Sequence, residues 1–168
     1  IAKVPSTISV VGDISYVYME TAQGPDTSEV TGSTGSVSYT YQGTGTTNYG
    51  PSTTIPTNAG TYQVVATLEA DDIYSGAISE PFQFTIVKAA STITVLGDVN
   101  YTYSGIGQGP NTVEVIGSLG NVSYMYVGTG DTSYGPSATL PKNVGSYQVV
   151  VTVAEDANYL GVTSDALD

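Results

Sequence analysis

The fold is decided by one stretch that occurs twice: residues 60–68 read GTYQVVATL, and residues 145–153 read GSYQVVVTV. From Tyr62 onward, every second residue is apolar, so that Tyr, Val, Ala and Leu share one face of an extended chain. Alternation of this kind over several residues is typical of a half-buried β-strand. The longest strand of each half of the chain is therefore predicted at these positions.

The sequence on either side of these stretches is repeated as well. Gly60 returns as Gly145, and the same offset of 85 residues holds without insertion, with roughly half of the paired positions identical. The 14 tyrosines divide equally between the halves, at matching places. We therefore predict two tandem domains, residues 1–87 and 88–168.

The fold class follows from the pattern between the repeated stretches. Other short segments alternate in the same way, turn sequences rich in Gly and Pro separate them, and no stretch keeps a helical period. About seven short strands in ~85 residues suit an immunoglobulin-like β-sandwich. The prediction is an all-β protein of two such sandwiches. The alternative is a pair of β-grasp-like repeats, which we disfavour because no segment supplies the helix of that fold.

A bend of the form Pro-x-Asn-x-Gly precedes each long strand, at residues 56–60 and 141–145. Tyr62 and Tyr147 follow directly, where a tyrosine corner would lie, with Val in place of the usual cysteine two residues later. We predict that these two tyrosines are structural.

Composition excludes several classes of function. Three Lys and Arg stand against 15 Asp and Glu, which gives a net charge of -12. Nucleic acid and anionic membrane are poor partners for such a surface, because both are bound chiefly through basic residues. The chain has no His and no Cys, so it lacks Ser-His and Cys-His nucleophiles, imidazole or thiolate metal sites and disulfides. We expect no catalysis.

Two tyrosines stand apart as ligand candidates. Tyr49 and Tyr134 lie in Tyr-Gly-Pro turns, where an aromatic ring could stack on a sugar. The other tyrosines alternate with Val, which favours core packing. The chain contains no Trp, the residue on which glycan binding also commonly relies.

The acidic residues offer a possible calcium site, because calcium takes six to eight oxygen ligands. Their spacing matches no EF-hand, and a solvated acidic surface is the interpretation that we favour. The candidate ligands share positions in corresponding loops or just after the first strand of each repeat: Asp13, Asp71, Asp72, Asp98, Glu155 and Asp156.

Several short elements recur in the same order in both repeats. In the first they are Tyr16-x-Tyr18, residues 23–25 (QGP), residues 39–45 (YTYQGTG), residues 49–51 (YGP), residues 58–62 (NAGTY), Asp71-x-x-Tyr74-x-Gly76 and residues 84–89 (FTIVKA). In this respect both repeats resemble the MBG domain of the YGX type, a tandem module of bacterial surface proteins, especially large secreted adhesins of Bacteroidota. Residues 19–22 and 104–107 differ from each other and carry the least weight.

The resemblance implies an extracellular location at the bacterial cell surface and a stalk or spacer role, with no catalytic residues to transfer. Neighbouring repeats of the same chain would then be the partners. The alternative is a glycan-binding or accessory module that contacts surface polysaccharide.

The two ends of the sequence fall within the repeat. Ile1 corresponds to Ile86, and Asp168 corresponds to Gln83, within the apolar segment 82–87. We expect a window from a longer array whose second repeat lacks its last strand. A sandwich in that state would present an apolar groove and an unpaired backbone edge, to which a strand from another chain could add.

Overall fold

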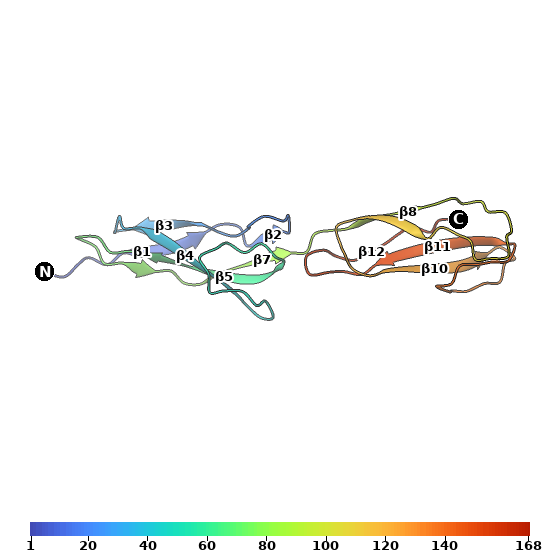
Figure 1. Cartoon of the computed structure of the whole chain (residues 1–168). Helices are drawn as coiled ribbons and strands as arrows, with labels where there is room; N and C mark the ends of the chain where they lie inside the picture. The colour runs from blue at the N-terminus through green and yellow to red at the C-terminus, as the bar shows by residue number, and fades with distance from the viewer. The chain divides into compact units, whose positions relative to one another are not determined.

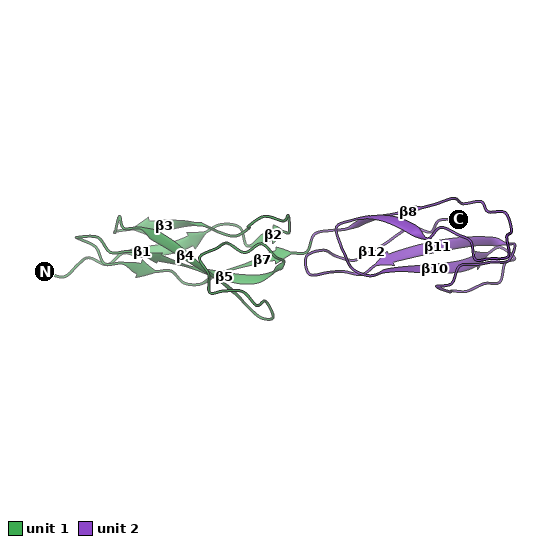
Figure 2. Cartoon of the chain, in the orientation of Figure 1, with its two compact units in different colours: residues 1–88 green, residues 89–168 purple.

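A computed structural model describes all 168 residues, and every regular element in it is a β-strand (Figure 1). The predicted all-β fold is therefore confirmed. The chain divides into two compact units, residues 1–88 and 89–168 (Figure 2). The sequence placed the boundary one residue earlier.

Unit 1 consists of two sheets. A small sheet pairs β1 with β3, and a larger sheet has the strand order β2-β7-β5-β4, with β6 also paired to β5. The strands are β1 (Thr7–Val11), β2 (Ser15–Val17), β3 (Thr27–Thr31), β4 (Val37–Gly43), β5 (Gly60–Leu68), β6 (Ala77–Ile78) and β7 (Phe82–Val87).

The strand β5 lies at the centre of the larger sheet. It pairs antiparallel with β4 along one edge and with β7 along the other, where Tyr62 lies opposite Phe84. β2 then pairs parallel with β7, with Tyr16 opposite Ile86. β1 and β2 are consecutive in the chain but belong to different sheets, so this segment connects the two layers.

The core of unit 1 lies between the two sheets. Ile8 and Val10 of the small sheet belong to the same buried cluster as alternate residues of β4, β5 and β7. The inward face of β5 carries Tyr62, Val64 and further small or aliphatic residues, none of them more than 2 % exposed. The alternation in the sequence thus separates the buried face of this strand from its outer face.

Phe84 is at the centre of an aromatic cluster in this core. Its ring stacks on Tyr62 with a centroid distance of 5.4 Å and meets Tyr16 and Tyr41 edge to face, at 6.0 and 6.4 Å. These offset and edge-on arrangements are the favourable ones for aromatic pairs. Gly24 lies against the same ring, because a Cβ added there would come within 2.9 Å of it.

Unit 2 repeats five of the seven strands. They are β8 (Thr92–Leu96), β9 (Thr112–Ile116), β10 (Val122–Thr129), β11 (Ser146–Val153) and β12 (Val162–Thr163). β8 pairs with β9, and the second sheet has the order β10-β11-β12. The core of this unit is built around Tyr126, Val149 and Val151.

The two strands without a counterpart in unit 2 are those that pair with each other in unit 1, β2 and β7. Residues 100–102, which correspond to β2, form no strand. The place of Phe82 is taken by Leu167, which forms an isolated antiparallel bridge with Val149, as Phe82 pairs with Val64 in β5. The second repeat therefore begins its closing strand in the register of the first.

Replacing Phe84 by Ala should destabilise unit 1 by about 3 to 5 kcal/mol, the usual cost of deleting a buried aromatic side chain. Phe82→Ala is a matched control, since Phe82 lies on the same face of β7 but is only half-buried, and its cost should be smaller. Urea unfolding followed by resonances assigned to each unit would measure both effects. Equal costs for the two variants would contradict the central role of Phe84.

Candidate functional site

Tyr62 and Tyr147 make the same contact in both units. The Tyr62 hydroxyl donates to the carbonyl oxygen of Asn58 at 2.7 Å, and that of Tyr147 to Asn143 at 2.8 Å. Each bond returns to the backbone four residues upstream, which is the contact that defines a tyrosine corner. The geometry ties the preceding bend to the central strand.

The two turn tyrosines that were candidates for stacking on a sugar, Tyr49 and Tyr134, are each fixed by a hydrogen bond at the hydroxyl and by a ring contact. The Tyr49 hydroxyl donates to Thr54 O at 2.6 Å, while its ring meets the corner ring of Tyr62 at a centroid distance of 5.7 Å and an angle of 85°. Tyr134 repeats this arrangement with the carbonyl of Thr139 and the ring of Tyr147. Both side chains are half-buried. These contacts favour a structural role for the pair in closing the turns.

A third pair of tyrosines links strand and loop inside the core. The hydroxyls of Tyr41 and Tyr126 donate to the carbonyls of Pro25 and Pro110, each at 2.7 Å. Burial, and then the negative charge of Asp26, raises the pKa of Tyr41 to about 12. The proline carbonyl of the Gln-Gly-Pro sequence thus accepts a hydrogen bond from a core tyrosine in both repeats, a role that the sequence did not reveal.

Asp71 organises the loop before β6. One carboxylate oxygen accepts the backbone N–H groups of Ile73 and Tyr74 at 2.9 and 2.7 Å, and the other accepts the N–H of Thr34 at 2.8 Å. The hydrogen bonds from Thr34, Tyr74 and Ile73 hold the pKa of Asp71 well below its usual range. The carboxylate therefore joins two loops that are far apart in the sequence.

Asp156 does the same in unit 2. Its carboxylate accepts the N–H groups of Leu119, Asn158 and Tyr159 at 2.8 to 2.9 Å. The remaining calcium candidates are Asp13, Asp72, Asp98 and Glu155, and all of them are exposed. The structure brings no three acidic side chains together in a group that could hold a metal ion. Two of the six candidate ligands are thus loop anchors.

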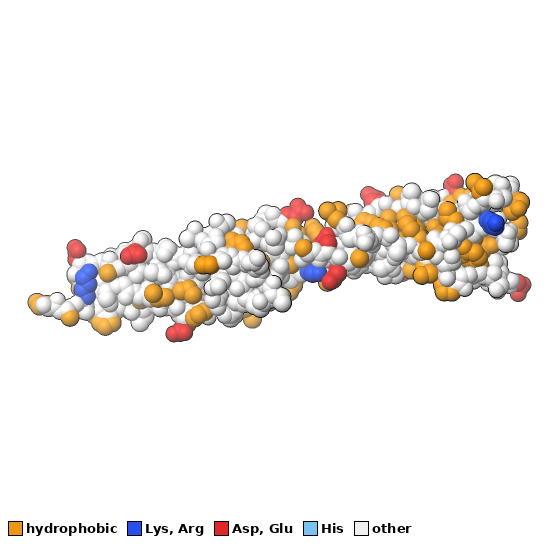
Figure 3. Space-filling view, turned by 60° about the horizontal axis from the view of Figure 1, so that its bottom comes forward, with side chains coloured by type: hydrophobic (Ala, Val, Ile, Leu, Met, Phe, Trp, Pro, Cys, Tyr) orange, Lys and Arg blue, Asp and Glu red, His pale blue; other side chains and the backbone are white.

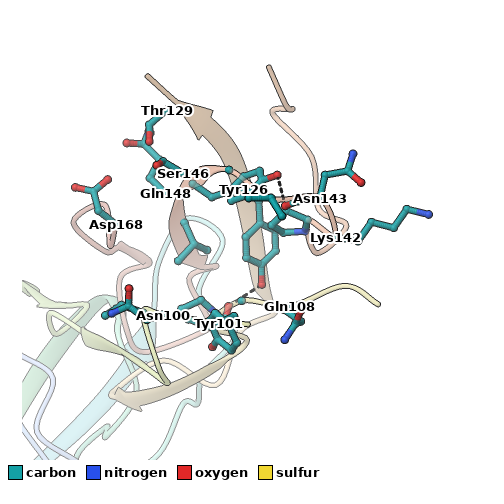
Figure 4. A pocket seen from close by; sticks show the side chains of 18 of the residues that line it. Asn100, Tyr101, Gln108, Tyr126, Thr129, Lys142, Asn143, Ser146, Gln148 and Asp168 are labelled. Carbon is teal, nitrogen blue, oxygen red and sulfur yellow. Dashed lines mark hydrogen bonds between the residues drawn. The ribbon is translucent and has the colours of Figure 1, made fainter. Parts of the chain in front are cut away.

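A groove with a volume of about 820 Å³ lies on unit 2 (Figure 4). Tyr126 stands in its middle, with Asn100 and Tyr101 at one edge and Lys142 and Asn143 at another. Hydrophobic side chains gather over the same unit in the space-filling view of Figure 3. Tyr101 is 44 % exposed there, whereas its counterpart Tyr16 is half-buried against Phe84.

These features define a class: a tandem-repeat β-protein in which each unit keeps the same internal contacts. The chain belongs to the MBG domain family, since the MBG domain matches it twice in tandem, over residues 7–90 and 91–168. The resemblance to tandem MBG domains that was inferred from the sequence motifs is confirmed. Comparison with curated proteins and with solved structures gives no match.

Family membership gives a coarse functional class. MBG domains occur as repeat modules of surface proteins, and they are not known as enzymes. The structure contains no helix long and apolar enough to cross a membrane.

The corner contact leads to a prediction for Tyr62. Tyr62→Phe should cost about 1 kcal/mol, the share of one hydrogen bond. Tyr62→Ala should cost about 3 kcal/mol or more, because it also removes a ring that is 2 % exposed. Chemical denaturation of unit 1 measures both. An unchanged midpoint for Tyr62→Ala would contradict the corner assignment.

The depressed pKa of Asp71 predicts an acid-labile loop. A carboxyl whose folded pKa lies below its unfolded value stabilises the fold above pH about 4, and this contribution is lost as the pH falls further. Asp71→Asn should lower the melting temperature of unit 1 by a few degrees at pH 7 and by less near pH 2. An amide has a single acceptor oxygen, so it cannot accept both the N–H of Thr34 and those of Ile73 and Tyr74.

Asp72→Asn is the matched control, since Asp72 is the exposed neighbour of Asp71. Melting curves between pH 2 and 7 compare the two variants with the parent chain. If Asp72→Asn reproduces the effect of Asp71→Asn, general surface charge and not the anchored carboxylate is responsible.

Proposed function

We propose that these two MBG repeats are a structural spacer within the stalk of a secreted, extracellular bacterial adhesin. The observation that carries the proposal is the duplication of structural hydrogen bonds. The side chains that could have bound ligands, Tyr49, Tyr134, Asp71 and Asp156, bind the backbone of their own unit instead. Side chains used in this way maintain the shape of a module.

The acidic composition supports the same function. A net charge of -12 with three basic residues keeps an array soluble and discourages lateral association between like chains. The partners of each repeat are its neighbours in the chain, and neither nucleic acid nor a membrane is a partner. These domains carry out no catalysis.

The connection between the units is short. Residues 87–90 read VKAA and contain no flexible Gly or Ser stretch. In a spacer, such a connection would restrict the angle between successive repeats, so that the stalk transmits position and force.

Distance measurements between spin labels test the spacer function. The chain has no cysteine, so labels on Thr46→Cys and Asp131→Cys, two exposed turn residues at matching positions, would be specific. We expect a narrow distribution of distances, and a broader one after insertion of Gly-Ser-Gly-Ser between Lys88 and Ala89. Equally broad distributions in the two chains would refute a rigid spacer.

A glycan array tests the alternative module. If the chain binds a polysaccharide, and if Tyr134→Ala abolishes this binding while unit 2 remains folded, the spacer proposal is wrong and the glycan-binding module is supported. The spacer proposal expects no glycan to bind through this turn.

A further inference from the structure

A pulling force along the chain enters unit 1 at its first residues and leaves it after β7. These two points lie at opposite ends of the unit (Figure 2). The force therefore acts first on β1 and β2 at the entrance and on β7 at the exit. The way in which these strands are bonded to the rest of the unit determines how well the unit resists extension.

At the exit, β7 lies between two neighbouring strands, and it pairs with three residues of β2 and five of β5. Hydrogen bonds join β7 to the β2 segment at both ends of their pairing, from Thr85 N–H to Ile14 O at 3.0 Å and from Tyr18 N–H to Val87 O at 2.9 Å. Because β2 and β7 are parallel, the N-terminal end of β2 and the C-terminal end of β7 lie at opposite ends of the pair. A force that separates the ends of the unit thus pulls the two strands lengthwise past each other and loads all of their hydrogen bonds at once.

The side chains of β7 oppose the same sliding movement. Phe84 and Ile86 are 2 and 1 % exposed and belong to the core of the unit. The Phe84 ring contacts Tyr16 of β2 and Tyr62 of β5, at centroid distances of 6.0 and 5.4 Å. A strand that slides by one residue turns its core side chains to the opposite face. β7 therefore cannot move along its neighbours in small steps without losing these contacts.

The entrance of the unit is bonded to a loop. Val4 donates its N–H to Ile73 O at 3.0 Å and accepts the N–H of Ser75 at 2.9 Å, in a parallel bridge. The same bridge recurs in unit 2, where Ala89 pairs with Tyr159. The chain is thus fixed to its own unit before a force from the N-terminal side reaches β1.

We propose that β7, paired with β2 and with residues 60–64 of β5, is a mechanical clamp that keeps unit 1 folded under tension along the chain. The inference rests on the proposed spacer function for the source of that tension, since a stalk is pulled at both of its ends. The resistance itself is a property of unit 1. It is expected to be high for a force that shears the clamp and low for a force that opens it from one end.

Single-molecule pulling on the full chain in two directions tests the clamp. The chain has no cysteine, so handles can be attached specifically to pairs of introduced cysteines. The end-to-end pair is Ala2→Cys with Ala90→Cys, and the peeling pair is Thr57→Cys with Ala90→Cys; all three positions are exposed. Thr57 precedes β5, and Gly60 at the start of β5 lies opposite Ile86, so the peeling pair opens the ladder one residue pair at a time.

At one loading rate, end-to-end pulling should require about twofold more force than peeling, or higher, because unfolding under force is governed by the unfolding barrier in the direction of the pull. Unit 1 should then unfold in a single step. Equal forces in the two directions would overturn the proposal. So would the release of β7 alone at low force, seen as a short step before the rest of the unit unfolds.

A matched pair of variants tests the bond at the end of the clamp. Tyr18→Pro removes the N–H that reaches Val87 O, whereas Tyr18→Ala removes the same ring and keeps this N–H. Under a constant end-to-end force, Tyr18→Pro should unfold about fivefold faster than Tyr18→Ala, the value of one hydrogen bond. Under a peeling force the two rates should be nearly equal. An equal difference in both directions would show a general loss of stability and would refute the clamp.

The clamp and the spacer function fail in different measurements. A narrow distribution of spin-label distances together with equal forces in the two directions would remove the clamp and leave the spacer. A broad distribution together with a direction-dependent force would refute the rigid spacer and support the clamp as a property of the unit.

Discussion

The pairing of β7 with β5 is the interaction on which the rest of unit 1 depends. It brings Phe84 onto Tyr62, and it provides the edge to which β2 adds in parallel. In the sequence, β7 is close to the end of the repeat and β2 is close to its beginning. Their pairing therefore joins residues that are separated by nearly the whole length of the repeat. Without disulfides, this closure relies on aromatic packing and on the hydrogen bonds of the ladder.

Tyrosine is suited to these positions because each one combines an apolar ring with a polar end. Tyr41 is 1 % exposed, yet its hydroxyl reaches the carbonyl of Pro25. A phenylalanine would fill the same space but would leave that carbonyl without its donor, and a buried polar group without a partner is costly. The recurrence of three such bonds in both units explains why these six tyrosines lie at matching places in a sequence that is only half identical.

The sequence predicted the repeat from the identities at an offset of 85 residues, and it predicted the all-β class and the inward face of β5 from local alternation. Contacts that depend on distant loops were not predictable in the same way. Asp71 and Asp72 are neighbours of identical type, and only the fold places Thr34 beside the first of them. The one local signal was the Asp-x-x-Tyr spacing, which suits a carboxylate that binds backbone N–H groups two and three residues later.

Comparison of the two units also distinguishes the effect of the local sequence on strand formation from the effect of a neighbouring strand that is distant in the sequence. Residues 100–103 repeat the alternating tyrosines of β2 and its flank, yet they form no strand, whereas Tyr16 lies in one. The preference of tyrosine for strands is a preference for a pleated, half-buried surface, and that surface exists only where a neighbouring strand supplies it. In unit 1 that neighbour is β7. The pattern in the sequence thus determines which face of the segment turns inward, and the closing strand determines whether the segment becomes part of a sheet.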